Sequence, residues 1–447
     1  MLTTFYLQNF RSYREATLPL ASLTLLIGAN ASGKSNVLEA LQMLSRITRG
    51  QYLKDVFETL QREGALRGTI DDLTYSERAE FSLGCTFHRS GDLPISETSD
   101  ALYETFRITI KRAKQELIVT DEYMSYEGSN FPLYQVEHVA EDYSHQLKIA
   151  YNNFTRGGIK PQISCDNRQA IFTQLTTPAR FTTPAAQERL PQCTQSFRRT
   201  LEQMLFLDPI PQQMRGYSFV KDTDLKSDGA NISSVLFDLC REKQQKHRIL
   251  DFVQALPEQD IRDIDFLETP RREVMVQLEE SFGENTQWRE AALLSDGTLR
   301  VLAVAAAVLS APHGSLVIIE EIDNGVHPSR AETLLDNIQQ AAERRNLHVL
   351  LTTHSPALMD ALSIAAIPDV VYCYRDPQEG DSRLIRLEDL ADYPELIAQG
   401  TVGRLIQRGI LERYLKRDRP LPQEKTEQAL AWLQSIKHIK PETSILP

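Results

Sequence analysis

Residues Gly28 to Ser35 have the types and the spacing of a loop that binds phosphate groups. The loop reads Gly28-Ala29-Asn30-Ala31-Ser32-Gly33-Lys34-Ser35, which is the pattern G-x-x-x-x-G-K-S. Gly28 and Gly33 let the backbone turn so that its N–H groups point at phosphate oxygens, and Lys34 adds a mobile cation. Ser35 adds a hydroxyl that can bind Mg²⁺. The segment therefore predicts a site for a nucleotide together with a divalent cation.

An apolar strand precedes this loop and a helix follows it, which is the context that the motif requires. The strand covers Leu25–Ile27, and apolar residues then recur with helical spacing at positions 37, 38, 40 and 41. A helix N-terminus favours anions because its first N–H groups are unpaired and the helix dipole is positive there. A chance glycine-rich turn is the weaker interpretation, because both flanking elements are present.

A second chemical element lies far downstream, at the end of another apolar strand. Residues Ser315–Ile319 are typical of a fully buried strand, and the acidic pair Glu320-Glu321 follows directly. A nucleotide hydrolase places a Mg²⁺-side carboxylate and a general base at such a strand end, in the arrangement called Walker B. The alternative is an acidic pair at a solvated strand end.

Two further segments have candidate roles at an anionic ligand. Ser295, Asp296 and Gly297 stand in the turn Leu294–Thr298, which leads into an apolar helix over residues 299–309 and thus places N–H groups at a helix N-terminus. His354 follows the strand of residues 348–351, at the carboxyl edge where parallel α/β sheets bind ligands. Taken singly, the first could be an ordinary helix cap and the second a loop histidine.

The order of these four elements resembles the ATPase heads of the ABC superfamily, and more closely the RecF, SMC and OLD-like branch that does not serve transporters. The opening segment Asn9-Phe10-Arg11-Ser12-Tyr13, and Asn36 directly after Gly-Lys-Ser, are similar to that branch. The stretches 320–328 and 352–356 are most similar to its soluble, defence-associated members of the RloA type. The resemblance covers about the first fifty residues and about residues 294–360.

The resemblance implies a role for each matching residue. Glu321 would polarise the attacking water, His354 would contact the γ-phosphate, and Lys34 would bind phosphate. Ser35 and Glu320 would hold Mg²⁺. The nucleotide-binding set implied in this way is Gly28, Asn30, Ala31, Ser32, Gly33, Lys34, Ser35, Asn36 and Arg11. Ser295, Asp296 and Gly297 would act in trans, on the ATP of a second copy, so that a homodimer or a higher homo-oligomer sandwiches the nucleotides.

The sequence departs from the ABC pattern at two of these positions and leaves a third role open. Glu320 stands where such heads usually have Asp, and Asp296 stands where transporters commonly have Gly, so that a negative charge meets the incoming γ-phosphate. Slow or gated hydrolysis is therefore a hypothesis. A nucleotide-sensing glutamine is assigned to Gln212 or Gln213, after the strand of residues 205–207, with a proline-bounded polar loop as the alternative.

The expected fold class is α/β: a P-loop NTPase head of the ABC type, with a mixed, largely parallel sheet, an antiparallel β flank and an inserted, mainly helical lobe. The expected domains are residues 1–127 for the first half of the head, 128–285 for the inserted lobe, 286–395 for the second half, and 396–447 for a helical tail with a helix over Glu424–Ile436. The sequence has no sustained heptad repeat, so a long coiled-coil arm is not expected. The tail is too short for the TOPRIM nuclease domain that OLD-family members carry.

Composition narrows the choice of partners. The 447 residues include 49 basic and 61 acidic side chains, a net charge of −12, which disfavours a protein that coats nucleic acid over its whole surface. Local basic patches at residues 111–114, 243–248 and 404–419 leave DNA contact open. No run approaches the roughly eighteen apolar residues of a membrane span, and no signal peptide precedes the first strand, so that a cytoplasmic location and no membrane partner are expected. The five scattered cysteines have no zinc-binding spacing.

The leading functional hypothesis is an ATP-binding and hydrolysing switch. With ATP and Mg²⁺ as its cofactors, it would control a separately encoded nuclease or toxin in anti-phage defence or DNA metabolism. The alternatives are a RecF-like repair ATPase that binds DNA directly, and an ATP-dependent scaffold with negligible turnover.

Overall fold

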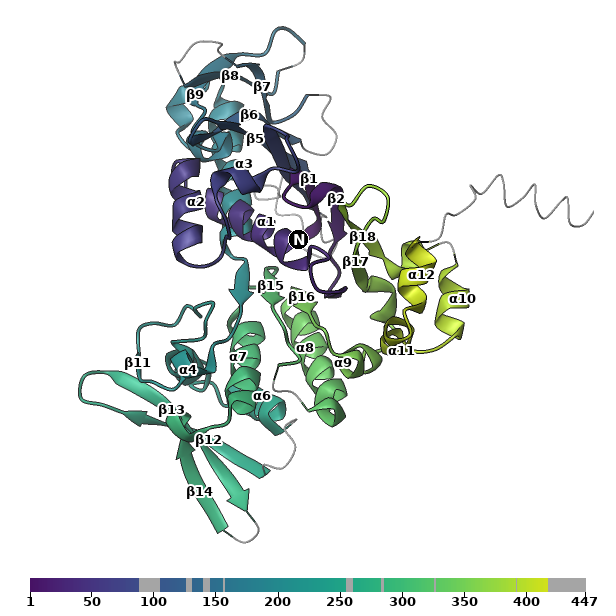
Figure 1. Cartoon of the computed structure of the whole chain (residues 1–447). Coiled ribbons are helices and arrows are strands. Elements are labelled where there is room, and N and C mark those ends of the chain that lie inside the picture. Colours follow the sequence, from purple (N-terminus) through teal and green to yellow (C-terminus); the bar gives the residue numbers. More distant parts are fainter. Residues whose placement is uncertain are drawn as a thin grey trace, which may run out of the picture.

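The structure is a computed structural model, and it describes residues 1–87, 105–125, 131–139, 145–155, 157–254, 260–282, 285–324, 327–390 and 392–416. Three sheets and their helices make up these residues (Figure 1). None of the described helices is both long enough and apolar enough to cross a bilayer. The expected helix over Glu424–Ile436 lies outside the described residues.

The central sheet carries the phosphate loop. Its strands, in spatial order, are β10 (Leu205–Leu207), β15 (Leu316–Ile319), β16 (His348–Thr352), β3 (Leu23–Ile27), β17 (Val371–Arg375) and β18 (Ser382–Arg386). The first five strands are parallel, and β18 pairs antiparallel with β17. Parallel strands of this kind are covered on both faces.

The two faces of the central sheet belong to two different hydrophobic cores. In β15, Leu316 and Ile318 lie in the first core, whereas Val317 and Ile319 lie in the second. Side chains alternate between faces along a strand, and here both faces are apolar, which explains why the sequence of β15 shows no polar alternation.

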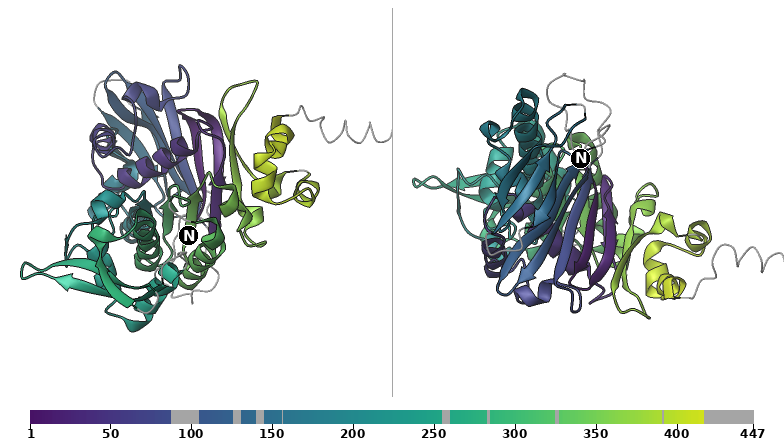
Figure 2. Two further views of the ribbon diagram at one scale, coloured as in Figure 1. Left: turned by 60° about the horizontal axis from the view of Figure 1, so that its bottom comes forward. Right: turned by 90° about the horizontal axis from the view of Figure 1, so that it is seen from above.

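The first core fills the space between the central sheet and a large antiparallel sheet. The strands of that sheet, in spatial order, are β2 (Tyr13–Pro19), β1 (Leu2–Phe10), β4 (Glu80–Phe87), β5 (Thr105–Ala113), β6 (Glu116–Ser125), β7 (Tyr134–Val139), β8 (Gln146–Tyr151) and β9 (Gln162–Asp166). Figure 2 shows these strands running side by side, with β18 next to β2. Three helices pack on this side: α1 (Lys34–Ile47), α2 (Leu53–Arg62) and α3 (Pro184–Glu202).

The second core joins the central sheet to the remaining helices. These are α4 (Pro211–Met214), α5 (Ile232–Leu239), α6 (Lys243–Gln254), α7 (Asp296–Ser310), α8 (Ala331–Arg345), α9 (Pro356–Asp360), α10 (Tyr393–Ala398), α11 (Val402–Gln407) and α12 (Ile410–Lys416). The 3₁₀ turns among the described residues are η1 (Ile70–Leu73), η2 (Ile171–Gln174), η3 (Pro178–Arg180), η4 (Ala291–Leu293), η5 (Pro328–Arg330), η6 (Ile367–Asp369) and η7 (Leu387–Asp389).

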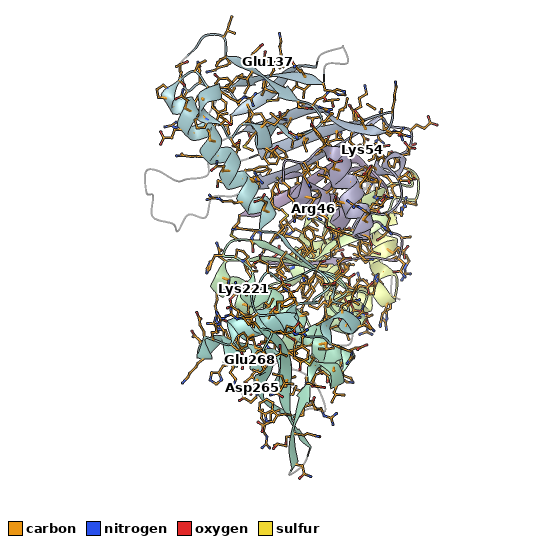
Figure 3. All side chains as sticks on the ribbon, turned by 90° about the vertical axis from the view of Figure 1, so that its left-hand side faces the viewer. Arg46, Lys54, Glu137, Lys221, Asp265 and Glu268 are labelled. Carbon is orange, nitrogen blue, oxygen red and sulfur yellow. The ribbon has the colours of Figure 1, made fainter. Side chains whose placement is uncertain are left out.

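A small third sheet projects from the second core. It contains β11 (Ser218–Phe219), β13 (Glu273–Phe282), β12 (Asp260–Glu268) and β14 (Asn285–Glu290), all antiparallel. Asp265 and Glu268 on β12 therefore lie at the opposite end of the molecule from Glu137 on β7 (Figure 3).

The expected fold class is confirmed, but one expectation about the middle of the chain is wrong. The antiparallel sheet continues past residue 127 through β7, β8 and β9, and residues 128–285 contain strands as well as helices instead of a mainly helical lobe. The polar composition of residues 127–191 hid these strands, because they lie at one side of the sheet and several of their side chains face solvent. Among the described residues the longest helix, α3, has 19 residues and forms no coiled-coil arm.

Candidate functional site

The phosphate loop connects the buried strand β3 to helix α1. Gly28 and Gly33 have positive φ angles of 151° and 122°, which L side chains rarely adopt. Gly33 stands at the N-cap of α1 and has no side chain to bond the first N–H groups of the helix. The helix N-terminus is therefore open to an anion.

The side chain of Lys34 lies back along this loop. Its Nζ donates to the carbonyl oxygens of Gly28, at 2.7 Å, and Ala29, at 3.1 Å. Burial lowers the pKa of the Lys34 ammonium, and the negative charge of Glu321 acts in the opposite direction. The phosphate loop and the Walker B carboxylates leave β3 and β15 at the same edge of the central sheet, because both strands pair in parallel with β16.

Strand β18 and the start of β2, with the residue before it, hold the loop from the other side. The Ser382 hydroxyl donates to the Ser32 carbonyl at 2.6 Å and contacts the Ser12 hydroxyl at 2.7 Å. The Tyr13 hydroxyl donates to the Gly33 carbonyl at 3.1 Å. The opening motif of the chain thus has a structural role, because Ser12 and Tyr13 hold the backbone of the phosphate loop.

Arg11 faces Glu39 on helix α1. Its Nε lies 2.6 Å from a Glu39 carboxylate oxygen, and both side chains are buried. Arg67 bonds the other oxygen of Glu39 at 2.6 Å and the amide oxygen of Asn36 at 3.0 Å. Arg11 and Asn36 are therefore tied into one network beside the loop, and their contact with a nucleotide stays a prediction.

Three carboxylates gather beyond the strand ends next to the loop. Burial, followed by the negative charges of Asp208 and Glu321, raises the pKa of Glu320 to about 7. Desolvation and the charge of Glu321 raise the pKa of Asp208 as well. Asp208 follows β10, which pairs with β15, so that Asp208 and Glu320 leave neighbouring strands at the same edge.

Glu321 is held in an unusual backbone conformation, with φ at 47°. Its N–H donates to the Thr352 hydroxyl at 2.9 Å, and its carboxylate accepts from the Asn324 side-chain amide at 2.5 Å. A positive φ in a residue other than glycine is strained and persists where the surroundings impose it. The exposed Glu321 carboxylate is thus oriented by contacts with β16 and with the loop after β15.

His354 follows β16, as the sequence predicts, and its backbone is fixed from the Walker B side. Asp323 accepts a hydrogen bond from the Thr353 hydroxyl at 2.6 Å and one from the His354 N–H at 3.3 Å. The imidazole of His354 is exposed at the carboxyl edge of the sheet.

The signature segment, Leu294–Thr298, lies at the start of α7, on the other side of the central sheet from α1. The Ser295 hydroxyl caps α7 by accepting from the Thr298 N–H at 3.1 Å. Ser295 and Asp296 are exposed, and Gly297 is half-buried. Leu294 belongs to the second core, whereas the helix that follows the phosphate loop is packed in the first.

The structure places the two candidate sensor glutamines after the end of strand β10. Gln212 and Gln213 are exposed on the short helix α4, and their assignment as sensors stays a prediction. The residue at the strand end is Asp208, three positions before α4 begins at Pro211. Its acidic type directly after the apolar residues 205–207 was the signal available in the sequence, and it repeats the strand-then-acid pattern of Glu320.

The donor set fits a magnesium ion that is shared with a nucleotide. Among the described residues no group of three or more His, Cys, Asp or Glu side chains is arranged to hold a metal by itself. Mg²⁺ usually takes one or two carboxylates together with substrate phosphates. Burial and then the negative charges of Asp208 and Glu321 raise the pKa of Glu320, and a divalent cation would offset that negative charge. Glu320 and Ser35 are the residues that would hold it.

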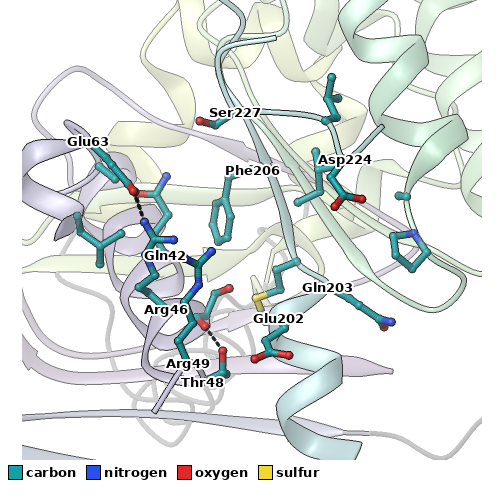
Figure 4. A pocket seen from close by; sticks show the side chains of 18 of the residues that line it. Gln42, Arg46, Thr48, Arg49, Glu63, Glu202, Gln203, Phe206, Asp224 and Ser227 are labelled. Carbon is teal, nitrogen blue, oxygen red and sulfur yellow. Dashed lines mark hydrogen bonds and ion pairs between the residues drawn. The ribbon is translucent and has the colours of Figure 1, made fainter. Parts of the chain in front are cut away.

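A cavity of about 620 Å³ lies away from this site (Figure 4). Phe206 projects into it, with Arg46 and Arg49 on one side and Asp224 on the other. The cavity is lined by the C-terminal ends of α1 and α7 and by the start of β10, which are the ends opposite to those that carry the phosphate loop, the signature segment and Asp208. The nucleotide site is therefore assigned from the loop and the carboxylates.

Replacing Glu320 by Gln is expected to change how the stability of the nucleotide-free protein depends on pH. The pKa of Glu320 rises from 4.5 to about 7 on folding, so the folded protein binds a proton that the unfolded chain has lost, and the free energy of unfolding falls as pH rises through this window. Glu320→Gln should therefore be more stable than wild type at pH 8, by roughly 1–3 kcal/mol, and should differ little at pH 5. Urea unfolding without Mg²⁺ at both pH values measures this.

The difference in the free energy of unfolding between wild type and Glu320→Gln reports the contribution of Glu320 alone. The buried Glu122 also has a pKa of about 7, but it is present in both proteins, and its contribution cancels in the difference. An equal gain in stability at pH 5 and pH 8 would contradict the assignment, since it would mean that the substitution acts through packing.

Two family models match the chain in succession. The model described as "AAA ATPase domain" matches residues 1–172, and the model described as "AAA domain, putative AbiEii toxin, Type IV TA system" matches residues 183–360. The two matches divide the chain at the connection into α3, between the phosphate loop and the Walker B segment.

Curated relatives and solved structures are similar to parts of the chain. The DNA replication and repair protein RecF of Crocosphaera subtropica is 38% identical over 91 residues, and that of a Synechocystis species is 35% identical over 91 residues. Each match covers 20% of this chain and 23% of the relative, so the chain resembles less than a quarter of those proteins' length. A solved SMC head bound to the C-winged helix domain of ScpA covers 86% of this chain and 97% of that chain, with a TM-score of 0.48 and 12% identity.

Proposed function

We propose that this chain is an ABC-type ATPase of the RecF- and SMC-like branch and that it works as an ATP-driven dimerisation switch. The observation that supports the proposal is the division of the site within one chain. The phosphate loop and the carboxylates stand together, whereas the exposed signature segment starts a helix of the other core. A second copy, related by a two-fold axis, would bring its signature segment to the nucleotide, and each chain would do the same for the other.

Each part of the site has a role in this scheme. The amides of the loop and Lys34 would hold the phosphates, with Lys34 exchanging its two carbonyl partners for phosphate oxygens. Glu320 and Ser35 would hold Mg²⁺, which neutralises phosphate charge when it is bound. Glu321 would orient the attacking water and accept its proton. His354 would donate a hydrogen bond towards the γ-phosphate.

The output of the switch would be a separately encoded partner protein. One matching family model is described as "AAA domain, putative AbiEii toxin, Type IV TA system", and this description supports a role in defence. Closing and opening of the dimer would move the projecting third sheet, which connects directly to the signature segment through η4.

The first experiment measures ATP turnover and molar mass of the purified protein together. We expect hydrolysis with ATP and Mg²⁺, and a dimer or larger assembly with ATP that returns to the smaller species with ADP. Assembly without turnover would favour the scaffold. Turnover with an unchanged mass under all conditions would contradict the dimerisation switch.

A RecF-like ATPase that binds DNA is the second candidate, and the identity to RecF proteins in the matched stretch favours it. Such a protein would hydrolyse ATP faster when DNA is present. Its affinity for DNA would fall steeply as the salt concentration is raised, because binding releases counterions from the DNA phosphates. Hydrolysis that is the same with and without DNA at low salt would argue against it.

A further inference from the structure

Arg215 holds the signature segment through three contacts. One guanidinium nitrogen donates to the carbonyl oxygens of Ala292, at 2.9 Å, and Leu294, at 2.8 Å. The other nitrogen donates to the Asp296 carboxylate at 2.6 Å. The planar fork of an arginine can make such contacts at once, which the single ammonium of a lysine cannot reproduce. The backbone before the signature and its acidic residue are thus fixed by one side chain.

The chain segment that carries Arg215 begins at the nucleotide site. Asp208 stands among the carboxylates, and seven residues later Arg215 follows the short helix α4. Backbone hydrogen bonds from Asp208 to Ser227, at 2.8 Å, and from Ile210 to Asp228, at 2.9 Å, anchor the segment. The phosphate-loop half of the site and the signature half are therefore connected within one chain by a short, well-bonded segment.

The charge of Asp296 explains why such a contact matters for function. A carboxylate in the first turn of a helix interacts favourably with the helix dipole, and Asp296 therefore suits α7 in the isolated chain. The same carboxylate would repel a γ-phosphate that arrives from a second copy. Arg215 supplies the opposite charge, and the pair is accessible, with exposed side-chain fractions of 31% for Arg215 and 54% for Asp296.

We propose that Arg215 is a positioning residue for the signature segment, one that neutralises Asp296 and so permits ATP held by a second copy to dock on α7. The inference rests on the proposed dimerisation switch and assigns to it a residue outside the recognised motifs. Arg215 acts through Asp296 and through the backbone of residues 292–294.

The test measures the dissociation constant of the ATP-bound dimer in a Glu321→Gln background, which keeps ATP intact. Arg215→Ala should weaken the dimer about tenfold or more, because an uncompensated negative charge then faces phosphate. Adding Asp296→Asn to Arg215→Ala should restore most of the affinity. Arg215→Lys should restore part of it. The matched control Arg344→Ala removes an exposed arginine on α8 and should change nothing.

Two further measurements separate positioning from folding and from nucleotide binding. Binding of a fluorescent ATP analogue to the monomer should stay within about twofold of the parent, because Arg215 contacts the signature segment and ATP binds first at the phosphate loop. The melting temperature of each variant shows whether it is folded. Equal dimer affinity for the parent and Arg215→Ala would overturn this inference alone. If Arg215→Ala weakened the dimer and Asp296→Asn did not restore the affinity, Arg215 would only stabilise the local fold, and the proposed neutralisation of Asp296 would be wrong. No ATP-dependent dimer in the parent would overturn the switch and this inference together.

Discussion

The Glu321→Gln protein is expected to bind ATP and to accumulate as an ATP-bound dimer, while it hydrolyses ATP at least about 100-fold more slowly than wild type. Glutamine has nearly the size of glutamate but cannot accept the proton of the attacking water. The N–H of residue 321 keeps its bond to Thr352, so the strained backbone of this position is preserved. Single-turnover hydrolysis and molar mass, measured on the same samples, follow both effects.

The control for this prediction is Glu332→Gln, which makes the same chemical change at an exposed position in the first turn of α8. It should hydrolyse ATP like wild type. If Glu321→Gln also turned over at the wild-type rate, the general base would have to be another group. Asp208 would be the first candidate, because burial alone still raises its pKa in that protein.

The sequence predicts those parts of the site in which one short segment contains all the residues that the chemistry needs. The phosphate loop needs two glycines, a lysine and a serine within eight residues. The structure places the two glycines between β3 and α1, and the lysine and the serine in the first turn of α1. The pair Glu320-Glu321 directly follows a strand that is apolar on both faces. Local spacing is enough in these cases, because no distant residue has to be known.

The roles of Asp208 and Arg215 do not follow from local spacing. The strand-then-acid pattern of Asp208 does not by itself bring this residue to Glu320, and the contacts of Arg215 are with residues distant in the sequence. Strand β10 has only three residues, and Asp208-Pro209 after it looks like an ordinary turn. Only the parallel pairing of β10 with β15 brings Asp208 to Glu320. Arg215 lies 81 positions from Asp296, and no periodicity in the sequence connects the two.

The limits of the fold prediction have a similar cause. Strands β7, β8 and β9 are short and stand in a polar stretch of sequence, and the alternation of exposed and buried side chains in β8 covers only Gln146 to Ile149. The buried Glu122, which accepts from the Tyr134 hydroxyl at 2.6 Å and from the N–H of Ile171 at 2.8 Å, binds β6, β7 and η2 together. Hydrophobic periodicity in the sequence does not predict a buried polar contact of this kind.

The Arg215 contact also changes the interpretation of the acidic signature. From the sequence alone, Asp296 is an unfavourable charge for an incoming phosphate and a reason for slow hydrolysis. With Arg215 at 2.6 Å, the segment presents an ion pair, so gating would depend on whether that pair is intact. Slow turnover in a protein whose pair is intact would then have to originate at the longer side chain of Glu320.

Gly28→Ala is expected to be the most damaging small substitution in the phosphate loop. A Cβ atom at this position would lie 2.2 Å from the carbonyl oxygen of Cys373 and 2.9 Å from the Ser32 hydroxyl, and the φ angle of 151° is itself unfavourable for alanine. The carbonyl belongs to strand β17 and cannot swing aside as a flexible side chain could. We expect a loss of about 2–4 kcal/mol in the free energy of unfolding, with ATP affinity reduced at least about tenfold.

Gly314→Ala separates the steric effect from the backbone effect. Gly314 also has a positive φ, of 76°, but a Cβ atom added there would meet no described atom within 4 Å, so alanine should cost only about 1–2 kcal/mol. Urea unfolding without nucleotide gives the stability of both variants, and binding of a fluorescent ATP analogue gives the affinity. Equal costs at the two positions would mean that β17 yields to the added methyl group. A larger cost at Gly28 means that β17 forms a rigid wall of the phosphate loop, and that the loop's geometry depends on a strand more than 340 residues away in the sequence.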